Sequence, residues 1–224
     1  MIWNKLTRFR LFKTKFSKKN LIRLCKENSS NKKTLVIHSE DVNYAPFFPN
    51  HFTITKRKNI KADMHVDDYY NDIKNIEDES YEIILCTGLL EHLPDPFFFI
   101  KNLKRILKPH GKLIISASCA FSIHEGPDNY FHFTPYSINN LFKDWSEISS
   151  IKGASQPFET IGILLQRILI QCDIIPIFRP IIEVISIIIP IFDKFILRQF
   201  NKAGRRDKSN LIDSMLPSNI QAVI

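Results

Sequence analysis

The stretch "YEIILCTGLLEHLPDPFFFIKNLKRILKPHGKLIIS", residues 81–116, decides the fold class of this 224-residue chain. Its first six residues form an apolar run that is typical of a strand buried on both faces of a sheet. From Pro96 to Leu107, apolar residues recur with helical spacing, and Pro96 occupies the first turn, where its missing N–H costs little. A second apolar strand begins at Lys112. This order of strand, helix and strand predicts a βαβ unit in a parallel sheet.

The same alternation extends in both directions along the chain. Upstream, β-rich runs at Leu35–Ile37, 51–58 and 62–68 predict three more strands, of which the last is the weakest. Downstream, residues 134–145 have helical spacing, and Thr134 is placed as their N-cap. The pattern predicts an α/β protein with a mostly parallel sheet.

The composition changes after Gly153. Residues 160–200 are rich in isoleucine and interrupted by prolines, which predicts two or three short apolar helices, and residues 219–224 predict a closing strand. We therefore expect four parts: a basic N-terminal arm (1–31), an α/β core (32–153), an apolar helical insertion or lid (154–210) and a closing segment with the last strand (211–224).

Charge and cysteine usage exclude several classes of protein. The net charge is +8, but residues 1–33 contain eleven Lys or Arg and one acid, which gives +10 and leaves about −2 for the rest. Nucleic-acid binding is disfavoured, because a near-neutral body offers no basic face beyond the arm. The four cysteines form no CxxC pair, which argues against a zinc knuckle or a disulfide framework. No signal peptide and no bilayer-spanning apolar run is visible, so we expect a cytoplasmic protein.

Polar residues directly follow the strand at 81–86. Ligands of open parallel sheets bind outside the carboxyl ends of the strands, so Thr87, Leu89, Glu91 and His92 are expected at the mouth of a cleft. The alternative for the last two is a pair that caps and orients the start of the next helix, because an acid is favourable near a helix N-terminus.

This region resembles the second half of a class I S-adenosylmethionine-dependent methyltransferase domain of the type 11 kind. The matching positions are Leu90-Glu91-His92, Asp95-Pro96, Arg105, Leu107-Lys108-Pro109 and Gly111. "HEGPDNYFHFTP" (124–135) resembles a segment of a subgroup often associated with envelope and surface-glycan biosynthesis, with His132 where arginine is usual. The resemblance covers roughly residues 33–150. It implies a doubly wound, mostly parallel Rossmann-like sheet with helices on both faces, and an apolar helical insertion before the last strand.

The resemblance also implies S-adenosylmethionine as cofactor, and here the chain departs from the family pattern. The family has a Gly-rich turn after the first strand, whereas this chain has His38, Ser39 and Glu40 there and no glycine before Gly88. These residues form either a site for another ligand or a loop that has lost its ligand. Where the family has an acid that ends the second strand and binds the ribose, this chain offers Thr55 or Lys56, and the ammonium of Lys56 cannot accept a hydrogen bond. Asp67 or Asp68 is expected at the adenine end.

Candidate catalytic residues follow the strand that begins at Lys112. His124, Asp128, Tyr130 and His132 lie where the resemblance implies the acceptor, and a histidine near a carboxylate can act as general base for a hydroxyl group. The alternative is a hydrogen-bonded loop that only covers the cleft. No metal site is expected, because His38, His51 and His65 have no useful spacing.

Two segments favour contact with an anionic membrane surface. Aromatic and apolar residues interleave with Lys and Arg in the basic arm, as in an interfacial amphipathic helix, and the 160–200 segment offers a second apolar contact. The alternatives are a disordered solubilising tail and a lid packed on the sheet edge. A membrane contact would place the protein on the inner face of the membrane.

The leading hypothesis is methyl transfer from S-adenosylmethionine to an envelope-glycan precursor, a lipid-linked intermediate or another small-molecule acceptor. Two rivals stand beside it. One is a degenerate methyltransferase fold that serves as a scaffold or partner subunit, which the missing glycines and Lys56 favour. The other is a peripheral membrane-binding protein in which the fold is incidental.

Overall fold

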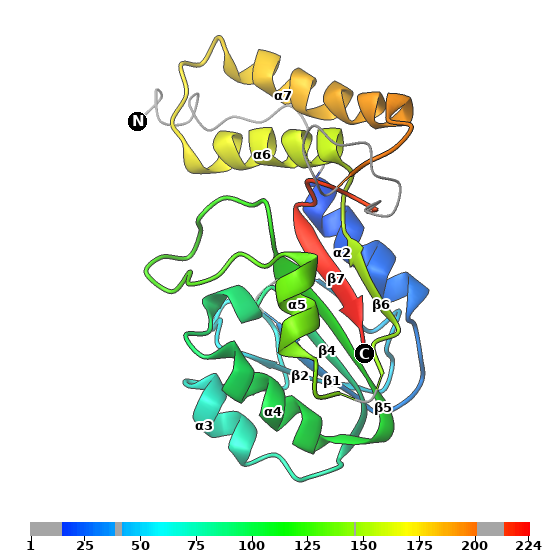
Figure 1. Ribbon diagram of the computed structural model, residues 1–224. Coiled ribbons are helices and arrows are strands. Elements are labelled where there is room, and N and C mark those ends of the chain that lie inside the picture. Colours follow the sequence, from blue (N-terminus) through cyan, green and yellow to red (C-terminus); the bar gives the residue numbers. More distant parts are fainter. Residues whose placement is uncertain (1–14, 39–41, 146, 201–212) are drawn as a thin grey trace. The chain divides into compact units, whose positions relative to one another are not determined.

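The computed structural model describes residues 15–38, 42–145, 147–200 and 213–224 (Figure 1). Its centre is a seven-stranded sheet in the order β3-β2-β1-β4-β5-β7-β6. The strands are β1 (Thr34–His38), β2 (His51–Thr55), β3 (Met64–His65), β4 (Tyr81–Thr87), β5 (Leu107–Ser118), β6 (Ser150–Gly153) and β7 (Asn219–Val223). The neighbours from β3 to β5 pair in parallel, and β7 pairs antiparallel with β5. The predicted α/β class and mostly parallel sheet are confirmed.

The direction of strand order reverses between β1 and β4. From β1 the chain builds outward to β2 and β3, and it then returns to place β4 and β5 on the other side. A crevice forms at such a reversal, outside the carboxyl ends of the strands. The fold therefore places the segments after β2, β3 and β4 around one possible binding site.

Helices cover both faces of the sheet, because alternate residues of each strand point to opposite faces. On one face, Ile84 and Cys86 of β4 share a core with the buried sides of α3 (Tyr69–Lys74), α4 (Pro96–Ile106) and α5 (Pro135–Leu141). On the other face, Ile83 and Leu85 share a core with Leu21, Leu24 and Cys25 of α2 (Phe16–Glu27).

Local sequence explains where the helices begin. Asp95 is the N-cap of α4 and accepts a hydrogen bond from the backbone N–H of Phe98 at 3.0 Å. Thr134 and Ser137 form a capping box at the start of α5. The helix predicted for 134–145 has the expected start but ends at Leu141.

The predicted basic arm contains α2, whose last turns contribute to the core. The aromatic residues of the arm before Phe16 lie outside the described residues. Throughout the described part of the chain, no helix combines the length and the apolar character needed to cross a membrane.

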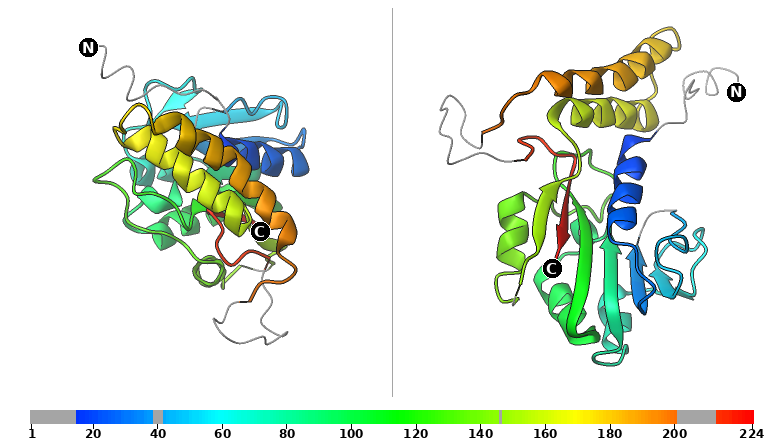
Figure 2. Two further views of the ribbon diagram at one scale, coloured as in Figure 1. Left: turned by 90° about the horizontal axis from the view of Figure 1, so that it is seen from above. Right: turned by 90° about the vertical axis from the view of Figure 1, so that its right-hand side faces the viewer.

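A second compact unit includes residues 120–122 and 153–218, as far as these are described. It contains α6 (Pro157–Gln171), α7 (Arg179–Ile188) and the 3-10 helix η2 (Ile189–Phe195), in agreement with the two or three short apolar helices predicted there. Figures 1 and 2 show α6 and α7 lying side by side as a hairpin. The close approach uses Gly162, where an added Cβ would lie 2.6 Å from the carbonyl oxygen of Ser186.

Two buried or half-buried charges close this hairpin. The carboxylate of Asp193 in η2 accepts hydrogen bonds from the backbone N–H groups of Phe158 and Glu159, both at 2.8 Å, at the N-terminus of α6. At the other end of α6, the guanidinium of Arg179 donates to the carbonyl oxygen of Leu169 at 2.7 Å. Each charge has the sign that the helix dipole favours at its position.

Candidate functional site

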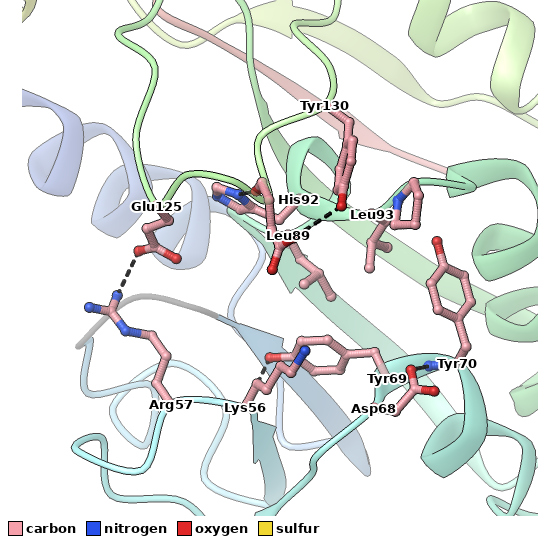
Figure 3. A pocket seen from close by; sticks show the side chains of 12 residues that line it. Lys56, Arg57, Asp68, Tyr69, Tyr70, Leu89, His92, Leu93, Glu125 and Tyr130 are labelled. Atoms are coloured by element: carbon pink, nitrogen blue, oxygen red, sulfur yellow. Dashed lines mark hydrogen bonds and ion pairs between the residues drawn. The ribbon is translucent and has the colours of Figure 1, made fainter.

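A cavity of about 410 Å³ lies at the carboxyl ends of β2, β3 and β4 (Figure 3). Its wall combines residues that follow three parallel strands with residues of the loop after β5. The lining residues are Lys56, Arg57, Asp68, Tyr69, Tyr70, Leu89, His92, Leu93, Pro94, Glu125, Asp128 and Tyr130. This is the position that the reversal of strand order predicts for a ligand.

Two tyrosines at the start of α3 fix the edges of the cavity. The Tyr69 hydroxyl oxygen accepts a hydrogen bond from the Lys56 backbone N–H at 2.9 Å, which ties α3 to the end of β2. The Tyr70 hydroxyl oxygen accepts one from the Asp95 N–H at 2.8 Å, which ties α3 to the turn before α4. Burial raises the pKa of both tyrosines, so both remain neutral hydrogen-bonding groups at physiological pH.

The Asp68 carboxylate forms hydrogen bonds with neighbouring residues and is not in an ion pair with Lys58, unlike Asp67. Its carboxylate accepts hydrogen bonds from the Tyr70 backbone N–H at 2.9 Å and from the Asn71 side-chain amide at 2.7 Å, as the N-cap of α3. The side chain still reaches the cavity wall. Asp67, its neighbour in the sequence, instead forms an exposed ion pair with Lys58 at 2.9 Å, and this pair lowers the pKa of Asp67.

An ion pair joins two sides of the cavity wall. Nη1 of Arg57 lies 3.2 Å from Oε1 of Glu125, and both side chains are about two-fifths exposed (Figure 3). Neither residue was among the candidates from the sequence. The pair connects the segment after β2 with the loop after β5, so it links the expected cofactor side of the cavity to the expected acceptor side.

Glu91 lies beneath the cavity wall and connects β4 to β5. It is 1% exposed, and its Oε1 accepts a hydrogen bond from the Ser118 hydroxyl at 2.7 Å. Its carbonyl oxygen accepts from the N–H groups of Tyr130 and Phe131. Burial raises the pKa of the Glu91 carboxyl group. Glu91 therefore anchors the loop that carries the predicted acceptor residues.

His92 lies on the cavity wall beside that loop. Its Nδ1 is 2.5 Å from the carbonyl oxygen of Asp128, and its ring packs edge-on against the ring of His124, with 4.8 Å between the centroids. The Tyr130 hydroxyl donates to the Asp128 carboxylate at 3.0 Å, and this interaction raises the pKa of Tyr130.

The structure brings together about half of the residues predicted from the sequence. Lys56, Asp68, Leu89, His92, Asp128 and Tyr130 line the cavity, and His124 lies against His92. Three others lie apart from the wall: Thr87 is buried and hydrogen-bonded to Tyr44 at 3.2 Å, Asp67 is exposed, and His132 is exposed. His38 ends β1, but its side chain, Ser39 and Glu40 lie outside the described residues.

Comparison with known proteins agrees with this architecture. Residues 49–115 match the family model described as a methyltransferase domain. A ubiquinone biosynthesis O-methyltransferase from Neisseria meningitidis is 28% identical over 61 residues, which are 27% of this chain and 24% of that protein. The enzyme of the same name from Coxiella burnetii is 50% identical over 38 residues, 17% of this chain and 16% of that protein. The matched segments thus span a quarter or less of these relatives.

Solved structures resemble nearly the whole chain. A SAM-dependent methyltransferase from Archaeoglobus fulgidus gives a TM-score of 0.57 with 14% identity, covering 92% of this chain and 91% of that one. The cyclase SpnF gives the same TM-score with 12% identity, covering 94% and 83%. At these identities the likeness shows the fold, and a cyclase among the neighbours illustrates that one fold supports different chemistry.

Proposed function

We propose that this chain, of which residues 49–115 match a methyltransferase domain, is a class I methyltransferase that transfers a methyl group from S-adenosylmethionine to a hydroxyl oxygen of its acceptor. The observation that carries the proposal is the cavity at the carboxyl ends of β2, β3 and β4, most of whose lining residues lie within the matched segment. The names of the curated relatives, O-methyltransferases of ubiquinone biosynthesis, support oxygen as the accepting atom.

Several cavity residues suit parts of S-adenosylmethionine, the cofactor that we propose. Leu89, Leu93 and the ring of Tyr69 offer the apolar and aromatic surface that suits an adenine ring, and Asp68 offers a carboxylate beside them. A volume of about 410 Å³ is typical of a small-molecule site. Besides the missing Gly-rich turn, one departure lies on the cavity wall: Lys56 brings a cation to the place where the family has a ribose-binding acid. We infer that cofactor affinity is lower than in relatives with that acid.

The loop after β5 supplies the acceptor side. When bound, S-adenosylmethionine supplies an electrophilic methyl group on a sulfonium sulfur, and S-adenosylhomocysteine remains after transfer. The chain must hold the acceptor hydroxyl in line with that methyl group and take up its proton. Asp128, whose carboxylate lines the cavity beside His92, is the best-placed proton acceptor, and His132 is set aside because it does not line the cavity.

The acceptor that we propose is lipid-linked and reached at an anionic membrane surface. Support comes from the hairpin, because α7 is apolar on its outer side and polar on its buried side. Its buried residues are Arg179, Glu183 and Ser186. Its exposed residues, with those of the segments beside it, are Ile168, Ile170, Ile175, Ile177, Phe178, Ile181, Val184, Ile185, Ile188, Ile191, Phe192, Phe195 and Leu197.

Ile181, Val184, Ile185 and Ile188 recur with helical spacing and are all exposed, so they share one face of α7. An exposed apolar face favours an interaction site, because isolated soluble proteins rarely expose large contiguous apolar patches. Lys194 and Arg198 follow α7 in the sequence and are exposed, which suits anionic lipid headgroups. A lipid-linked glycan precursor or a hydroxylated lipid would present its reactive group at such a surface.

Cofactor binding tests the proposed activity. Isothermal titration of the full chain with S-adenosylhomocysteine is expected to give micromolar binding. Lys56→Glu is expected to bind about tenfold more tightly, because a carboxylate can accept charge-assisted hydrogen bonds from ribose hydroxyls. Lys61→Glu makes the same charge change at an exposed residue outside the cavity wall and is expected to match the parent. If neither the folded parent nor Lys56→Glu binds S-adenosylhomocysteine, the methyltransferase proposal is rejected in favour of the scaffold function.

Vesicle co-sedimentation tests the proposed membrane contact. The parent chain is expected to bind vesicles that contain phosphatidylglycerol more strongly than vesicles of phosphatidylcholine alone. The double variant Ile181→Asp/Ile185→Asp is expected to lose at least tenfold in binding, since both side chains are about half-exposed on α7. Ile123→Asp, at an exposed isoleucine of the other unit, is the matched control. Equal binding by the double variant and the control would exclude the α7 face as the contact.

A further inference from the structure

The buried side-chain atoms that lack a hydrogen-bond partner in the described structure include two on adjacent residues at the cavity. They are Oε2 of Glu91 and Nε2 of His92, and neither finds a partner among the residues that the structure describes. Leaving such groups unsatisfied in the interior is costly, so native proteins usually pair them with a protein group, a water molecule or an ion. The two atoms lie on adjacent residues, one beneath the cavity wall and one on it.

The hydrogen bond of His92 determines what its free nitrogen needs. A carbonyl oxygen only accepts, so Nδ1 must carry the proton that it shares with the carbonyl oxygen of Asp128. In the neutral ring, Nε2 then presents a lone pair. The Glu91 Oε2 also presents lone pairs when the carboxyl group is ionised, so both orphaned atoms require an electron-pair acceptor.

A third ligand completes the arrangement. One ligand atom from each of Glu91, His92 and His124 lies within 4.8 Å of the others. Two ligands of one zinc ion are about 3.3 Å apart in a tetrahedral site, so modest side-chain movements would bring the three atoms onto one ion. We propose that Glu91, His92 and His124 bind a divalent transition-metal ion, with Zn²⁺ the best match for two imidazoles and a carboxylate.

Neighbouring groups already hold two of these ligands as metal ligands are commonly held. The carbonyl oxygen of Asp128 fixes the tautomer and ring orientation of His92, and the Ser118 hydroxyl orients the Glu91 carboxylate through its other oxygen. Such outer contacts are typical of protein metal sites. Three protein ligands would leave a fourth position for water or substrate, as in catalytic zinc sites.

The place of the site suggests its role, and this part of the inference rests on the proposed function. A metal ion at His92 would lie at the cavity wall, beside the loop that carries Asp128. It would bind the acceptor hydroxyl and lower the pKa of that group. The hydroxyl proton would pass to the Asp128 carboxylate, and the metal-bound oxygen would then form its bond to the methyl carbon as the carbon–sulfur bond breaks.

Metal binding can be measured without any activity. Untagged full-length protein carrying Cys172→Ser, which removes an exposed thiol, is stripped with a chelator, dialysed and titrated with ZnCl₂ by calorimetry. We expect one ion per chain, and Co²⁺ in its place should give the visible absorption of a four- or five-coordinate ion. Glu91→Gln, His92→Asn and His124→Asn are each expected to weaken Zn²⁺ binding at least tenfold.

His132→Asn is the matched control, because it changes an exposed histidine of the same loop outside the cluster. It should bind Zn²⁺ as the parent does. Absence of binding by folded, stripped protein, or equal binding by all four variants, would overturn the proposal. Titration with S-adenosylhomocysteine in chelator keeps the two proposals separate: cofactor binding without Zn²⁺ binding rejects the metal site alone, and the reverse result rejects the methyltransferase function.

Discussion

Strand β4 and helix α7 bury opposite kinds of side chain. In β4 the residues from Ile83 to Cys86 are apolar and almost fully buried, as the hydrophobic effect requires of a central strand. In α7 the buried residues are Arg179, Glu183 and Ser186, while Ile181, Ile185 and Ile188 are exposed. The sheet unit therefore has an apolar interior, whereas α7 has a polar buried side and several apolar residues on its exposed side.

The two regions consequently depend on different interactions. Burial of apolar area stabilises the sheet unit, at roughly 25 cal/mol for each Å² removed from water. The hairpin depends on specific polar contacts, namely Asp193 and Arg179 at the two ends of α6, and on the close approach at Gly162. Removing a buried apolar side chain should destabilise the sheet unit, and removing a polar contact should destabilise the hairpin. Changes at exposed side chains should have little effect on stability in either region. The following predictions test this contrast.

The largest effect is expected from the apolar core of the sheet unit. Phe99 is fully buried in α4 and packs edge-on against Tyr69 and Tyr70. Phe99→Ala should lower the free energy of unfolding by about 3–5 kcal/mol. Phe97→Ala, at a side chain that is 54% exposed in the same helix, should change it by less than about 0.5 kcal/mol. Urea denaturation measures both, and similar losses would remove the basis of the comparison.

In the hairpin the polar substitution should be the harmful one. Arg179→Met removes the guanidinium that caps the C-terminus of α6, leaves the Leu169 carbonyl oxygen without this donor, and should cost about 2 kcal/mol. Ile181→Ser, on the exposed face, should cost less than about 0.5 kcal/mol. Hydrogen exchange of the amides of α6 and α7 reports the local stability. A larger effect from Ile181→Ser would show that the apolar face is packed within the chain.

A smaller effect is expected where α6 approaches the end of α7. In Gly162→Ala the new methyl group would lie 2.6 Å from the Ser186 carbonyl oxygen, so the helices must separate slightly at a cost of about 1–3 kcal/mol. Gly126→Ala is the control, because a Cβ there would meet no atom within 4 Å. Hydrogen exchange of the hairpin amides again provides the measurement, and unchanged protection in Gly162→Ala would contradict the close approach.

The smallest effect concerns the buried carboxyl group of Glu91 in the sheet unit, and it appears as a pH dependence. Burial raises the pKa of Glu91 above its ordinary value of 4.5. Between the pKa of the unfolded state and the higher pKa of the folded state, the folded state therefore binds more protons than the unfolded state. Stability should therefore fall as the pH rises through this window. Glu91→Gln should remove that part of the slope while keeping an oxygen acceptor for Ser118.

Denaturation of both proteins from pH 5 to pH 8, in the presence of a chelator, measures the difference. The stability of Glu91→Gln relative to the parent should increase with pH. Parallel curves would show that the Glu91 carboxyl group does not titrate differently in the folded state.

Strong local patterns made much of the fold predictable. The strands β4 and β5 follow from apolar runs, and the start of α5 follows from Thr134. The contribution of α2 to the core could not be predicted, because Lys and Arg outnumber Leu21, Leu24 and Cys25 in that segment. The short elements α3 and β6 were not predicted either, because tertiary contacts outweigh local propensity in them.

The site was predictable where a residue lies close to the end of a strand or where the sequence resembles the family pattern. Strand ends identified His92 and Lys56 on the cavity wall, and the resemblance identified Asp128 and Tyr130. The ion pair of Arg57 and Glu125 joins residues far apart in the chain, so nothing in the local sequence indicated it. The proximity of His124 to the Glu91-His92 pair was hidden for the same reason, and no regular spacing of ligands reveals it.

The position of β7 has a consequence for the order of folding. Asn219 of β7 pairs with Ser118 of β5, so the docking of β7, which lies next to the edge strand β6, closes a loop of about a hundred residues. The entropy of closing so long a loop slows such pairings. A hairpin that forms early would shorten the effective loop, so we expect the rate at which β7 docks during refolding to depend on the stability of α6 and α7.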